Sequence, residues 1–301
     1  MALTAGRRSS IIKSLPSAEL LARVSKNNRM RREENAVSKV SIATLDGDPV
    51  TVEVLPDEHS LRSVTTRALF ARQSQPILLR CQSMAPGGAL EWTNARGDHG
   101  IFVMSGAVDV GGTHIEEGGM LIVEHGGSAS VESAGGAVLA VFEARSRPTR
   151  PGGNVHAILP DQIPRKSEYG GDPAVGFALL AASNCPTCAL WLHESRFGED
   201  HDTGLHSHSE DEVILVTKGE MILGRRGYGP GTAVAIAKDT VYAFQAGRGG
   251  LELVNFRASN SNFRRHGTND DLDEAAILIE DVGNPGHIPV GSPAQTSVSA
   301  S

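Results

Sequence analysis

The sequence is poor in the features that define several large classes of protein. Only three cysteines occur in 301 residues, a small and odd number that excludes a disulfide-built scaffold and favours a reducing, cytoplasmic compartment. The longest apolar runs, such as residues 137–142, fall far short of the ~20 residues that a membrane-spanning helix needs. Positive charge is not in excess either, because 35 acidic residues outnumber 28 basic ones. We therefore expect neither a membrane protein nor a nucleic-acid-binding protein.

Glycine and the strand-forming residues are plentiful instead. The chain contains 34 glycines and 15 prolines, set among many valines, isoleucines and threonines. This composition predicts short strands joined by tight turns, and hence an all-β fold. At one domain per ~150 residues, the chain is long enough for two domains.

The two ends of the chain differ from its middle. Residues 1–35 are basic and carry a short apolar stripe at helical spacing, so we predict a partly helical extension there. Residues 39–44 and 50–54 alternate with period two around an Asp-Gly-Asp sequence, which predicts a β-hairpin. Residues 270–280 are a helical candidate. The tail at 284–301 is rich in Pro, Gly, Ser and Ala, and we expect it to be disordered.

A displaced comparison of the chain with itself reveals an internal repeat. Shifted by 113 residues, the chain places Asp98 on Asp211 and Gly106 on Gly219, and identical residues meet at several positions between and beyond these. Shared glycines are what repeated tight turns demand, since only Gly accepts positive φ freely. Two copies of one β unit are therefore predicted. The linker between them is expected at residues 147–172, where Pro and Gly cluster.

The second copy contains a set of residues that could bind a metal ion. His206 and His208 precede a strand-like run, and Glu212 follows with the same two-residue period. Residues two apart on an extended backbone project to the same face. Two imidazoles and one carboxylate form the set used by non-heme Fe(II) enzymes, and they also suit Mn, Ni, Co or Zn. We predict one divalent metal ion on His206, His208 and Glu212, with Fe(II) favoured; the alternative is an exposed loop that alternates by chance.

This segment resembles the first motif of the cupin superfamily, G-x5-H-x-H-x3,4-E-x6-G. The matching positions are His206, His208, Glu212 and Gly219, whereas the leading glycine of the motif is missing. The resemblance implies a two-domain bicupin: two tandem double-stranded β-helix (jelly-roll) barrels behind the N-terminal helix and hairpin extension. The N-terminal barrel would cover residues 36–146 and the C-terminal barrel, with the metal site, residues 173–283.

The second cupin motif departs from the family pattern. It matches at Gly231, but Tyr242 stands where the resemblance implies a fourth, histidine ligand. Three roles stay open for Tyr242: a phenolate ligand, a catalytic general acid or base beside the metal, or a space-filling side chain. The first two require the cation to lower a phenol pKa that is normally ~10. In the first copy, ligand positions hold Thr93, Ala95 and His99, so we expect no metal site there and interpret His99 as an interior or rim histidine.

Other residues of the second copy could surround the site. Trp191 and His193 alternate on one strand-like run, and Phe244 shares the expected face of Tyr242. All three are predicted to line a substrate pocket, although core packing explains Trp191 equally well. Cys185 and Cys188 form a C-x-x-C motif, which elsewhere signals redox or zinc chemistry. Because neither a second pair nor a following helix accompanies it, the sequence assigns this motif no role.

The leading expectation is a metal-dependent enzyme acting on a small organic metabolite in the C-terminal barrel. A three-residue ligand set leaves room for a chelating substrate and dioxygen together, so an Fe(II) dioxygenase is its most specific form. One alternative is a non-redox, metal-dependent lyase, isomerase or aminohydrolase. Another is a bicupin that binds a small molecule without turnover. The resemblance also implies a homodimer.

Overall fold

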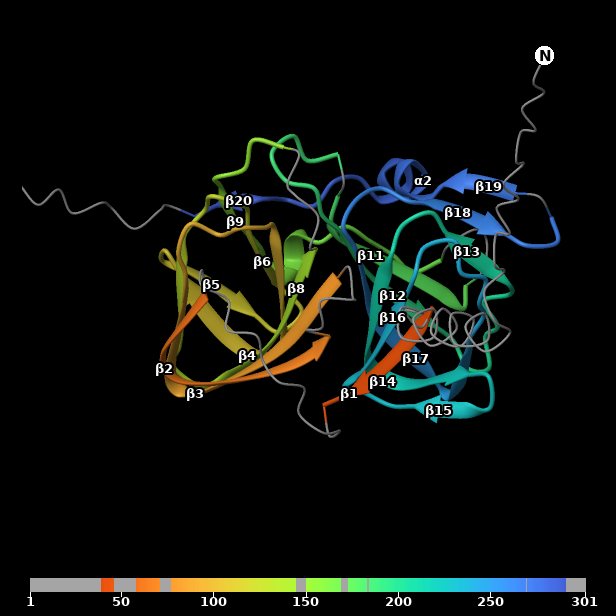
Figure 1. Cartoon of the computed structure of the whole chain (residues 1–301), viewed down its shortest axis with the longest axis horizontal. Coiled ribbons are helices and arrows are strands. Elements are labelled where there is room, and N and C mark those ends of the chain that lie inside the picture. Colours follow the sequence, from red (N-terminus) through yellow and green to blue (C-terminus); the bar gives the residue numbers. More distant parts are fainter. Residues whose placement is uncertain are drawn as a thin grey trace, which may run out of the picture. The chain divides into compact units, whose positions relative to one another are not determined.

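The computed structural model describes residues 39–45, 58–70, 77–144, 150–168, 173–182, 184–268 and 270–290 (Figure 1). Two predicted features lie outside these residues: the helical extension at 1–35 and the second strand of the hairpin at 50–54. Of the tail predicted to be disordered at 284–301, residues 284–290 are described and include the short strand β20 (Ile288–Pro289), whereas the rest lies outside the described residues. The elements, contacts and counts given for this protein are those of the described residues.

The N-terminal barrel is a nine-stranded antiparallel sheet. Its strands are β2 (Glu58–Phe70), β3 (Ile77–Trp92), β4 (His99–Val110), β5 (Thr113–Glu116), β6 (Met120–Val123), β7 (Ala129–Ser133), β8 (Ala137–Ala144), β9 (Val155–Ile158) and β20 (Ile288–Pro289). The strand order is β2-β3-β7-β4-β6-β9-β20, with β5 beside β4 and β8 paired to both β3 and β4.

The C-terminal barrel combines an eight-stranded and a three-stranded sheet. The larger sheet contains β1 (Val40–Thr44), β10 (Arg165–Lys166), β11 (Val175–Ala181), β12 (Trp191–Phe197), β14 (Glu212–Leu223), β15 (Arg226–Tyr228), β16 (Thr232–Ile236) and β17 (Gln245–Arg257). The smaller sheet contains β13 (His206–His208), β18 (Asn262–Arg265) and β19 (Asp270–Asp273). The predicted all-β, two-barrel jelly-roll architecture is confirmed.

Little of the described chain is helical. A 3-10 turn, η1 (Pro160–Gln162), falls between the barrels in the sequence, and the α-helix α2 (Glu274–Val282) follows β19. The side chain of Asp273 caps α2 by accepting a hydrogen bond from the Ala276 amide at 3.0 Å. The predicted helix at 270–280 therefore begins four residues late, because its first residues pair with β18. Among the described residues, no helix has the length and apolarity to cross a membrane.

Strand pairing crosses the predicted domain limits in both directions. Strand β1 pairs with β16 of the C-terminal barrel, although it was placed with the N-terminal barrel. In return, β20 pairs with β9 of the N-terminal barrel, and β9 itself lies in the predicted linker. Each barrel thus includes a strand that comes from the other end of the described chain.

The repeated glycines mark equivalent tight turns in the two barrels. Gly106 and Gly219 have φ angles of 75° and 70°. A Cβ atom on Gly106 would lie 2.2 Å from the Gly136 carbonyl oxygen, and one on Gly219 would lie 2.1 Å from the Gly250 carbonyl oxygen. Both the positive φ and the close carbonyl exclude other residues at this turn. The sequence repeat therefore reflects a shared steric constraint.

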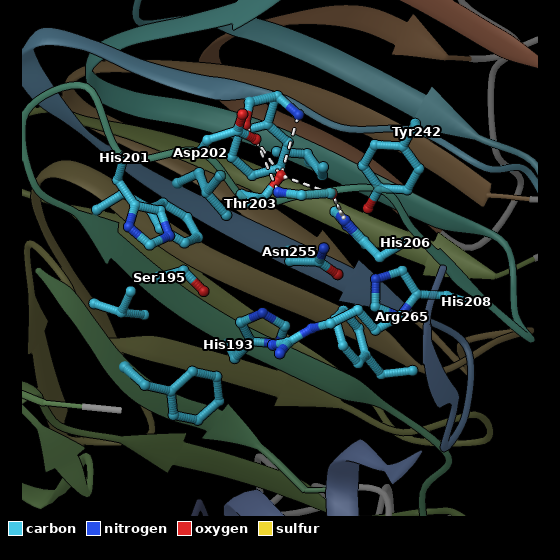
Figure 2. Close-up of a pocket in the computed structure, with 18 of the residues that line it drawn as sticks. His193, Ser195, His201, Asp202, Thr203, His206, His208, Tyr242, Asn255 and Arg265 are labelled. Carbon is cyan, nitrogen blue, oxygen red and sulfur yellow. Dashed lines mark hydrogen bonds between the residues drawn. The ribbon is translucent and has the colours of Figure 1, made fainter. Parts of the chain in front are cut away.

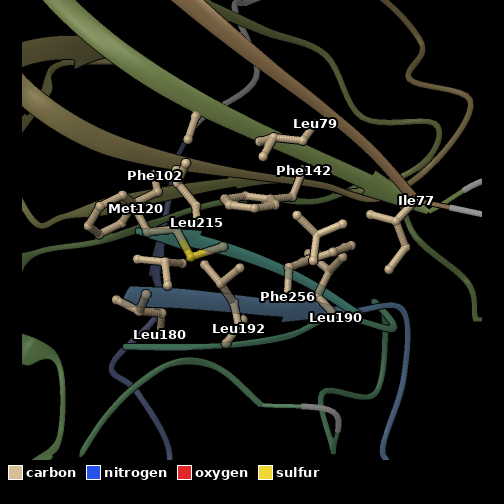
Figure 3. Packing of buried hydrophobic residues seen from close by; sticks show 14 of the residues in the cluster. Ile77, Leu79, Phe102, Met120, Phe142, Leu180, Leu190, Leu192, Leu215 and Phe256 are labelled. Atoms are coloured by element: carbon tan, nitrogen blue, oxygen red, sulfur yellow. The ribbon is translucent and has the colours of Figure 1, made fainter. Parts of the chain in front are cut away.

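Alternation along the strands creates four clusters of buried apolar side chains in the described residues. One fills the interior of the N-terminal barrel with side chains such as Trp92, Ile101 and Val131. A second lies between the barrels, where Phe142 of β8 stacks on Phe256 of β17 with ring centroids 5.3 Å apart (Figure 3). The third occupies part of the C-terminal barrel interior. The fourth is small and joins β11 and β12 to α2.

Candidate functional site

A cavity of about 590 Å³ lies in the C-terminal barrel (Figure 2). Its volume suits a small organic molecule. Its wall includes polar, charged and aromatic side chains, among them His193, Asp202, His206, His208, Tyr242, Asn255, Arg257, Phe263 and Arg265.

Strand β13 places the two motif histidines on this wall. It pairs with β18 so that His206 lies opposite Arg265 and His208 lies opposite Phe263. Opposite residues of an antiparallel pair share a face. The imidazole ring centroids of His206 and His208 are 5.4 Å apart. Both histidines are buried, so they do not belong to an exposed loop.

Glu212 lies beside a buried arginine that the sequence analysis did not single out. In the pairing of β14 with β17, Glu212 and Arg257 are directly opposite, and each is 1% exposed. Arg257 donates to Glu212 Oε2 from Nε at 3.3 Å and from Nη2 at 3.1 Å. The same Nη2 lies 3.1 Å from His208 Nε2, which must accept because a guanidinium carries no acceptor.

The Glu212 carboxylate has several further hydrogen-bond donors around it. Asn255 donates to Oε2 at 2.8 Å, and the Tyr242 hydroxyl donates to Oε1. Burial alone would raise the pKa of Glu212, but His208, Arg257, Tyr242 and Asn255 together outweigh it and lower the pKa to about 2. Glu212 is therefore an anion at neutral pH, and its charge is matched by Arg257.

Tyr242 packs against His206 and holds its hydroxyl proton toward Glu212. Tyr242 and His206 exchange backbone hydrogen bonds: the His206 amide donates to the Tyr242 carbonyl at 2.9 Å, and the Tyr242 amide donates to the His206 carbonyl at 3.0 Å. Their ring centroids are 4.3 Å apart. Because the phenol donates to a carboxylate, Tyr242 is a protonated neutral group in this arrangement. Of the three roles left open, this geometry disagrees with a phenolate ligand, and the general acid or base and the space-filling side chain stay as predictions.

The donor set can be tested for its fit to a divalent metal ion. In favour of a fit, His206 Nδ1 donates to the Gly204 carbonyl at 2.8 Å, an orientation that metal-binding histidines commonly have. Against it, Arg257 already contacts both His208 Nε2 and Glu212. Within the part of the chain that the structure describes, the possible ligand atoms of His206, His208 and Glu212 also do not all lie within 4.8 Å of one another. As arranged, these residues do not fit a metal ion, and the guanidinium supplies the positive charge.

The residues predicted to line the pocket are divided by the structure. His193 and Phe244 are part of the cavity wall. Trp191 is fully buried in a small apolar cluster with Leu278 of α2 and is not part of the wall. On β12 the wall is formed by the three following alternate positions, His193, Ser195 and Phe197, so Trp191 belongs to the core.

Sequence reasoning missed Asn255, Arg257, Phe263 and Arg265. A signal for the first two was present, because an amide and a guanidinium interrupt the otherwise apolar end of β17 at alternate positions. Asn255 and Arg257 therefore had to face the barrel interior. No such signal existed for Phe263 and Arg265, because β18 lies beyond the end of the internal repeat.

The N-terminal barrel has a different arrangement at the equivalent level. His99 is fully buried, and its Nδ1 lies 3.7 Å from Glu143 Oε2. The same carboxylate oxygen is 3.3 Å from Arg80 Nη1. Of the other two positions equivalent to ligands, Thr93 is exposed and Ala95 is buried in the core.

Comparisons with known proteins support the fold. No family model matches the sequence, and no curated protein matches it. Among solved structures, a candidate dioxygenase from Nostoc punctiforme has a TM-score of 0.53 at 13% identity, covering 79% of this chain and 88% of that chain. The oxalate decarboxylase of Lactobacillus farciminis, in a formate complex, has a TM-score of 0.54 at 12% identity, with 77% and 92% covered.

A pumpkin seed globulin is similar to the same extent. Its TM-score is 0.51 at 12% identity, covering 75% of this chain and 87% of that chain. Identities this low establish the architecture alone, and one architecture supports unrelated functions. The neighbours are cupin-type proteins. The chain therefore has the two-barrel fold of the cupin superfamily.

Proposed function

We propose that the C-terminal barrel binds a small organic carboxylate that also carries a hydrogen-bond donor such as a hydroxyl. The observation that carries this proposal is the buried Arg257, which takes the place of a metal cation between His208 and Glu212. Glu212 neutralises the charge of Arg257, so the positive charge that would attract an anion to this wall comes from Arg265.

The cavity wall offers groups for both ends of such a ligand. Arg257 and Arg265 are cations on the wall, the first buried and the second exposed, and Asp202 is exposed and accepts the Gly204 amide at 2.8 Å. Guanidinium groups match the planar geometry of a carboxylate. The Oδ1 atom of Asn255 is buried and has no hydrogen-bond partner within the described residues. An unpaired buried acceptor is costly, so a ligand hydroxyl that donates to it would bind favourably.

Proton transfer is the chemistry that this site can perform without a metal. The Gly204 carbonyl fixes the ring proton of His206 on Nδ1, so Nε2 carries the lone pair whenever the ring is neutral. His206 can then act as a general base toward a bound ligand. This role is that of a lyase or isomerase without a metal ion, which differs from the metal-dependent class expected from the sequence. The oxalate decarboxylase of similar fold, described with formate, also handles small carboxylates.

Calorimetric titration of chelator-treated protein tests the proposal. The probes are small hydroxycarboxylates such as lactate and malate, each paired with its neutral amide. We expect the acids to bind and the amides not to bind. The variant Arg265→Gln should weaken binding by about tenfold or more, because it removes a charged donor. The control Arg225→Gln, on an exposed turn, should bind as the wild type does. Equal affinity for acid and amide, or binding that requires an added metal ion, would overturn the proposal.

A metal-dependent enzyme, with an Fe(II) dioxygenase as its most specific form, is the second candidate. The spacing of His206, His208 and Glu212 favours it, as does the fold shared with a candidate dioxygenase. Proteins of this fold generally bind a divalent metal ion. This candidate requires Arg257 to release His208 and Glu212. Oxygen consumption by the protein that depends on added ferrous iron, and that is abolished in His206→Ala, would support it over the first candidate.

Homodimer formation and a cytoplasmic location also remain proposals. Sedimentation of the full chain distinguishes a monomer from a dimer directly.

A further inference from the structure

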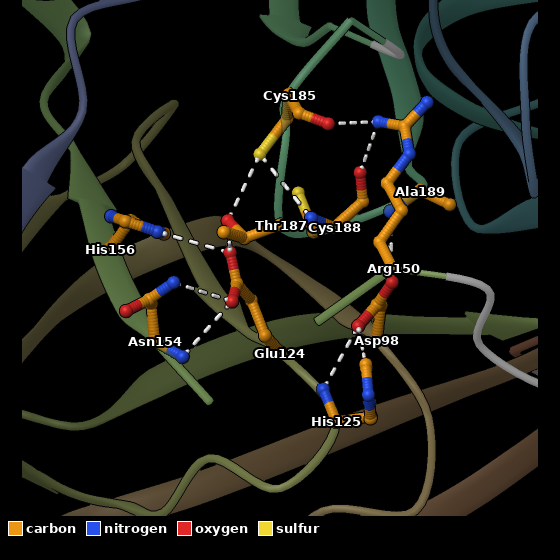
Figure 4. A network of polar contacts seen from close by, with 10 residues as sticks. All are labelled: Asp98, Glu124, His125, Arg150, Asn154, His156, Cys185, Thr187, Cys188 and Ala189. Carbon is orange, nitrogen blue, oxygen red and sulfur yellow. Dashed lines mark hydrogen bonds and ion pairs between the residues drawn. The ribbon is translucent and has the colours of Figure 1, made fainter. Parts of the chain in front are cut away.

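A second cluster of potential ligands lies at the junction of the two barrels (Figure 4). Glu124 follows β6 of the N-terminal barrel, whereas Cys185 and Cys188 lie in the segment between β11 and β12 of the C-terminal barrel. Two observations link the segments: Thr187 donates to Glu124 Oε1 at 2.6 Å, and the Ala189 amide donates to Asp98 Oδ2 at 2.9 Å. The C-x-x-C motif is thus held against a carboxylate from another part of the chain.

The three side chains already have the spacing of a metal site. One ligand atom from each of Glu124, Cys185 and Cys188 lies within 4.8 Å of the other two. Among the His, Cys, Asp and Glu side chains of the described residues, this is the group of three with ligand atoms so close together. Ligands of a tetrahedral zinc ion are roughly 3.3–3.8 Å apart when the Zn–S and Zn–O bonds are about 2.3 and 2.0 Å. Rotations of these side chains would bring all three into the first coordination sphere, with Glu124 Oε1 exchanging the hydrogen bond from Thr187 for the metal ion.

Glu124 is held in place by hydrogen bonds. It is fully buried, and Oε2 accepts from the amide and the side chain of Asn154 at 3.0 and 2.8 Å. His156 Nε2 lies 3.2 Å from Oε1. A histidine or amide that orients a carboxylate in this way is a common support for metal ligands.

Hydrogen bonds hold the two thiols in place. The Cys188 amide donates to Cys185 Sγ at 3.4 Å, and the Thr187 hydroxyl oxygen lies 3.5 Å from the same sulfur. Arg150 Nη1 donates to the backbone carbonyls of Cys185 and Cys188. The arginine therefore fixes the loop that carries both thiols.

We propose that Glu124, Cys185 and Cys188 form a binding site for a zinc ion that ties the two barrels together. Thiolates select soft or borderline metals, and the carboxylate completes a set of three protein ligands. The fourth position would hold a water molecule, because the group of ligand atoms close to one another consists of these three residues and does not include His156. A divalent ion would bind both sulfurs as thiolates, with release of the thiol protons. This site is distinct from the cavity of the C-terminal barrel.

Metal analysis of the full chain tests this site separately from the cavity. Protein dialysed against zinc should retain one zinc ion per chain, and cobalt in its place should give sulfur-to-metal charge-transfer absorption. The double variant Cys185→Ser/Cys188→Ser should lose both signals. The variant His206→Ala/His208→Ala should keep both, as should Cys81→Ala, which changes the third cysteine outside the cluster. Unchanged zinc content in the cysteine variant, or no zinc on the wild type, overturns the proposal.

Two further measurements keep the proposal testable if the cysteine variant fails to fold. Glu124→Gln preserves the shape of the side chain and removes its charge, and its Kd for zinc should rise at least about tenfold. Zinc should also protect Cys185 and Cys188 of the wild type against alkylation. Alkylation at the same rate with and without zinc, or isolation of the pair as a disulfide that binds no zinc, contradicts the site. Binding of the carboxylate probe in the cavity should not depend on zinc, so failure of either proposal can be recognised without the other.

Discussion

Arg257 lies directly opposite Glu212 across the β14–β17 pairing, with its Nη2 atom 3.1 Å from Glu212 Oε2 and 3.1 Å from His208 Nε2. Both members of this ion pair are buried. Removing one member of such a pair costs far more than the pair itself contributes, because the remaining charge has lost both water and its partner.

The first prediction concerns this ion pair. Arg257→Met should lower the free energy of unfolding by about 3–5 kcal/mol, since Glu212 would be left buried without its cation. The double variant Arg257→Met/Glu212→Leu should recover a large part of this loss. The exposed Arg225→Met serves as the control and should change stability by less than about 0.5 kcal/mol. Urea denaturation measures all four proteins. A single variant as stable as the control would show that the pair is not formed.

The second prediction is a loss of stability in acid that depends on Glu212. The folded-state pKa is about 2, against 4.5 in an unperturbed chain, so the folded protein holds the carboxylate ionised where the unfolded chain protonates it. The contribution is therefore complete above pH 4.5 and is lost as the pH falls from 4.5 through 2. It amounts to about 3 kcal/mol, since one pKa unit corresponds to ~1.36 kcal/mol.

Unfolding free energies measured between pH 6 and 2 test this dependence. Glu212→Gln should show a shallower decline than the wild type, whereas Glu116→Gln, an exposed residue of β5, should decline in parallel with the wild type. Parallel curves for the wild type and Glu212→Gln would contradict the prediction.

The third prediction concerns the repeated turn. Gly219→Ala should destabilise the protein by at least about 2 kcal/mol, because the new Cβ would lie 2.1 Å from the Gly250 carbonyl oxygen and φ is 70°. Gly249→Ala is a matched control, because its added Cβ meets nothing within 4 Å and its φ is not positive. Thermal unfolding of the two variants should therefore differ clearly, and equal Tm values would count against the constraint.

The fourth prediction addresses packing between the barrels. Phe256→Ala should cost about 3–5 kcal/mol, since the ring is fully buried against Phe142. A double-mutant cycle with Phe142→Ala should give a coupling of about 0.5–1.5 kcal/mol. Leu272→Ala, at a side chain that is 41% exposed, provides the surface control. Additive losses from the two phenylalanine variants would indicate that the rings do not interact.

The sequence predicts well whatever is encoded locally. Alternating residues and the glycines shared at Gly106 and Gly219 indicated strands, turns and two copies of one β unit, and the structure contains both barrels. The placement of His206 and His208 on one strand likewise followed from their spacing. These features depend on backbone geometry over a few residues, which the sequence expresses directly.

Long-range pairing accounts for what the sequence did not predict. Arg257 meets Glu212 only because β17 and β14 are neighbours, and Glu124 meets the C-x-x-C motif only because the barrels pack together. Trp191 and His193 alternate on one strand, but the neighbouring elements decide which of them reaches the cavity. Pattern analysis identifies such residues as inward-facing and does not identify their partners.

Because β1 pairs with the C-terminal barrel and β20 pairs with the N-terminal barrel, the strands hold the two halves of the described chain together. Cleavage of the backbone between the barrels would leave the two halves fastened, because each half retains an edge strand borrowed by the other. Conversely, a fragment that starts after residue 172 would lack β1 and would expose the bare edge of β16. An uncovered edge of this kind recruits strands from other molecules, so the separate halves are expected to aggregate where the intact chain does not.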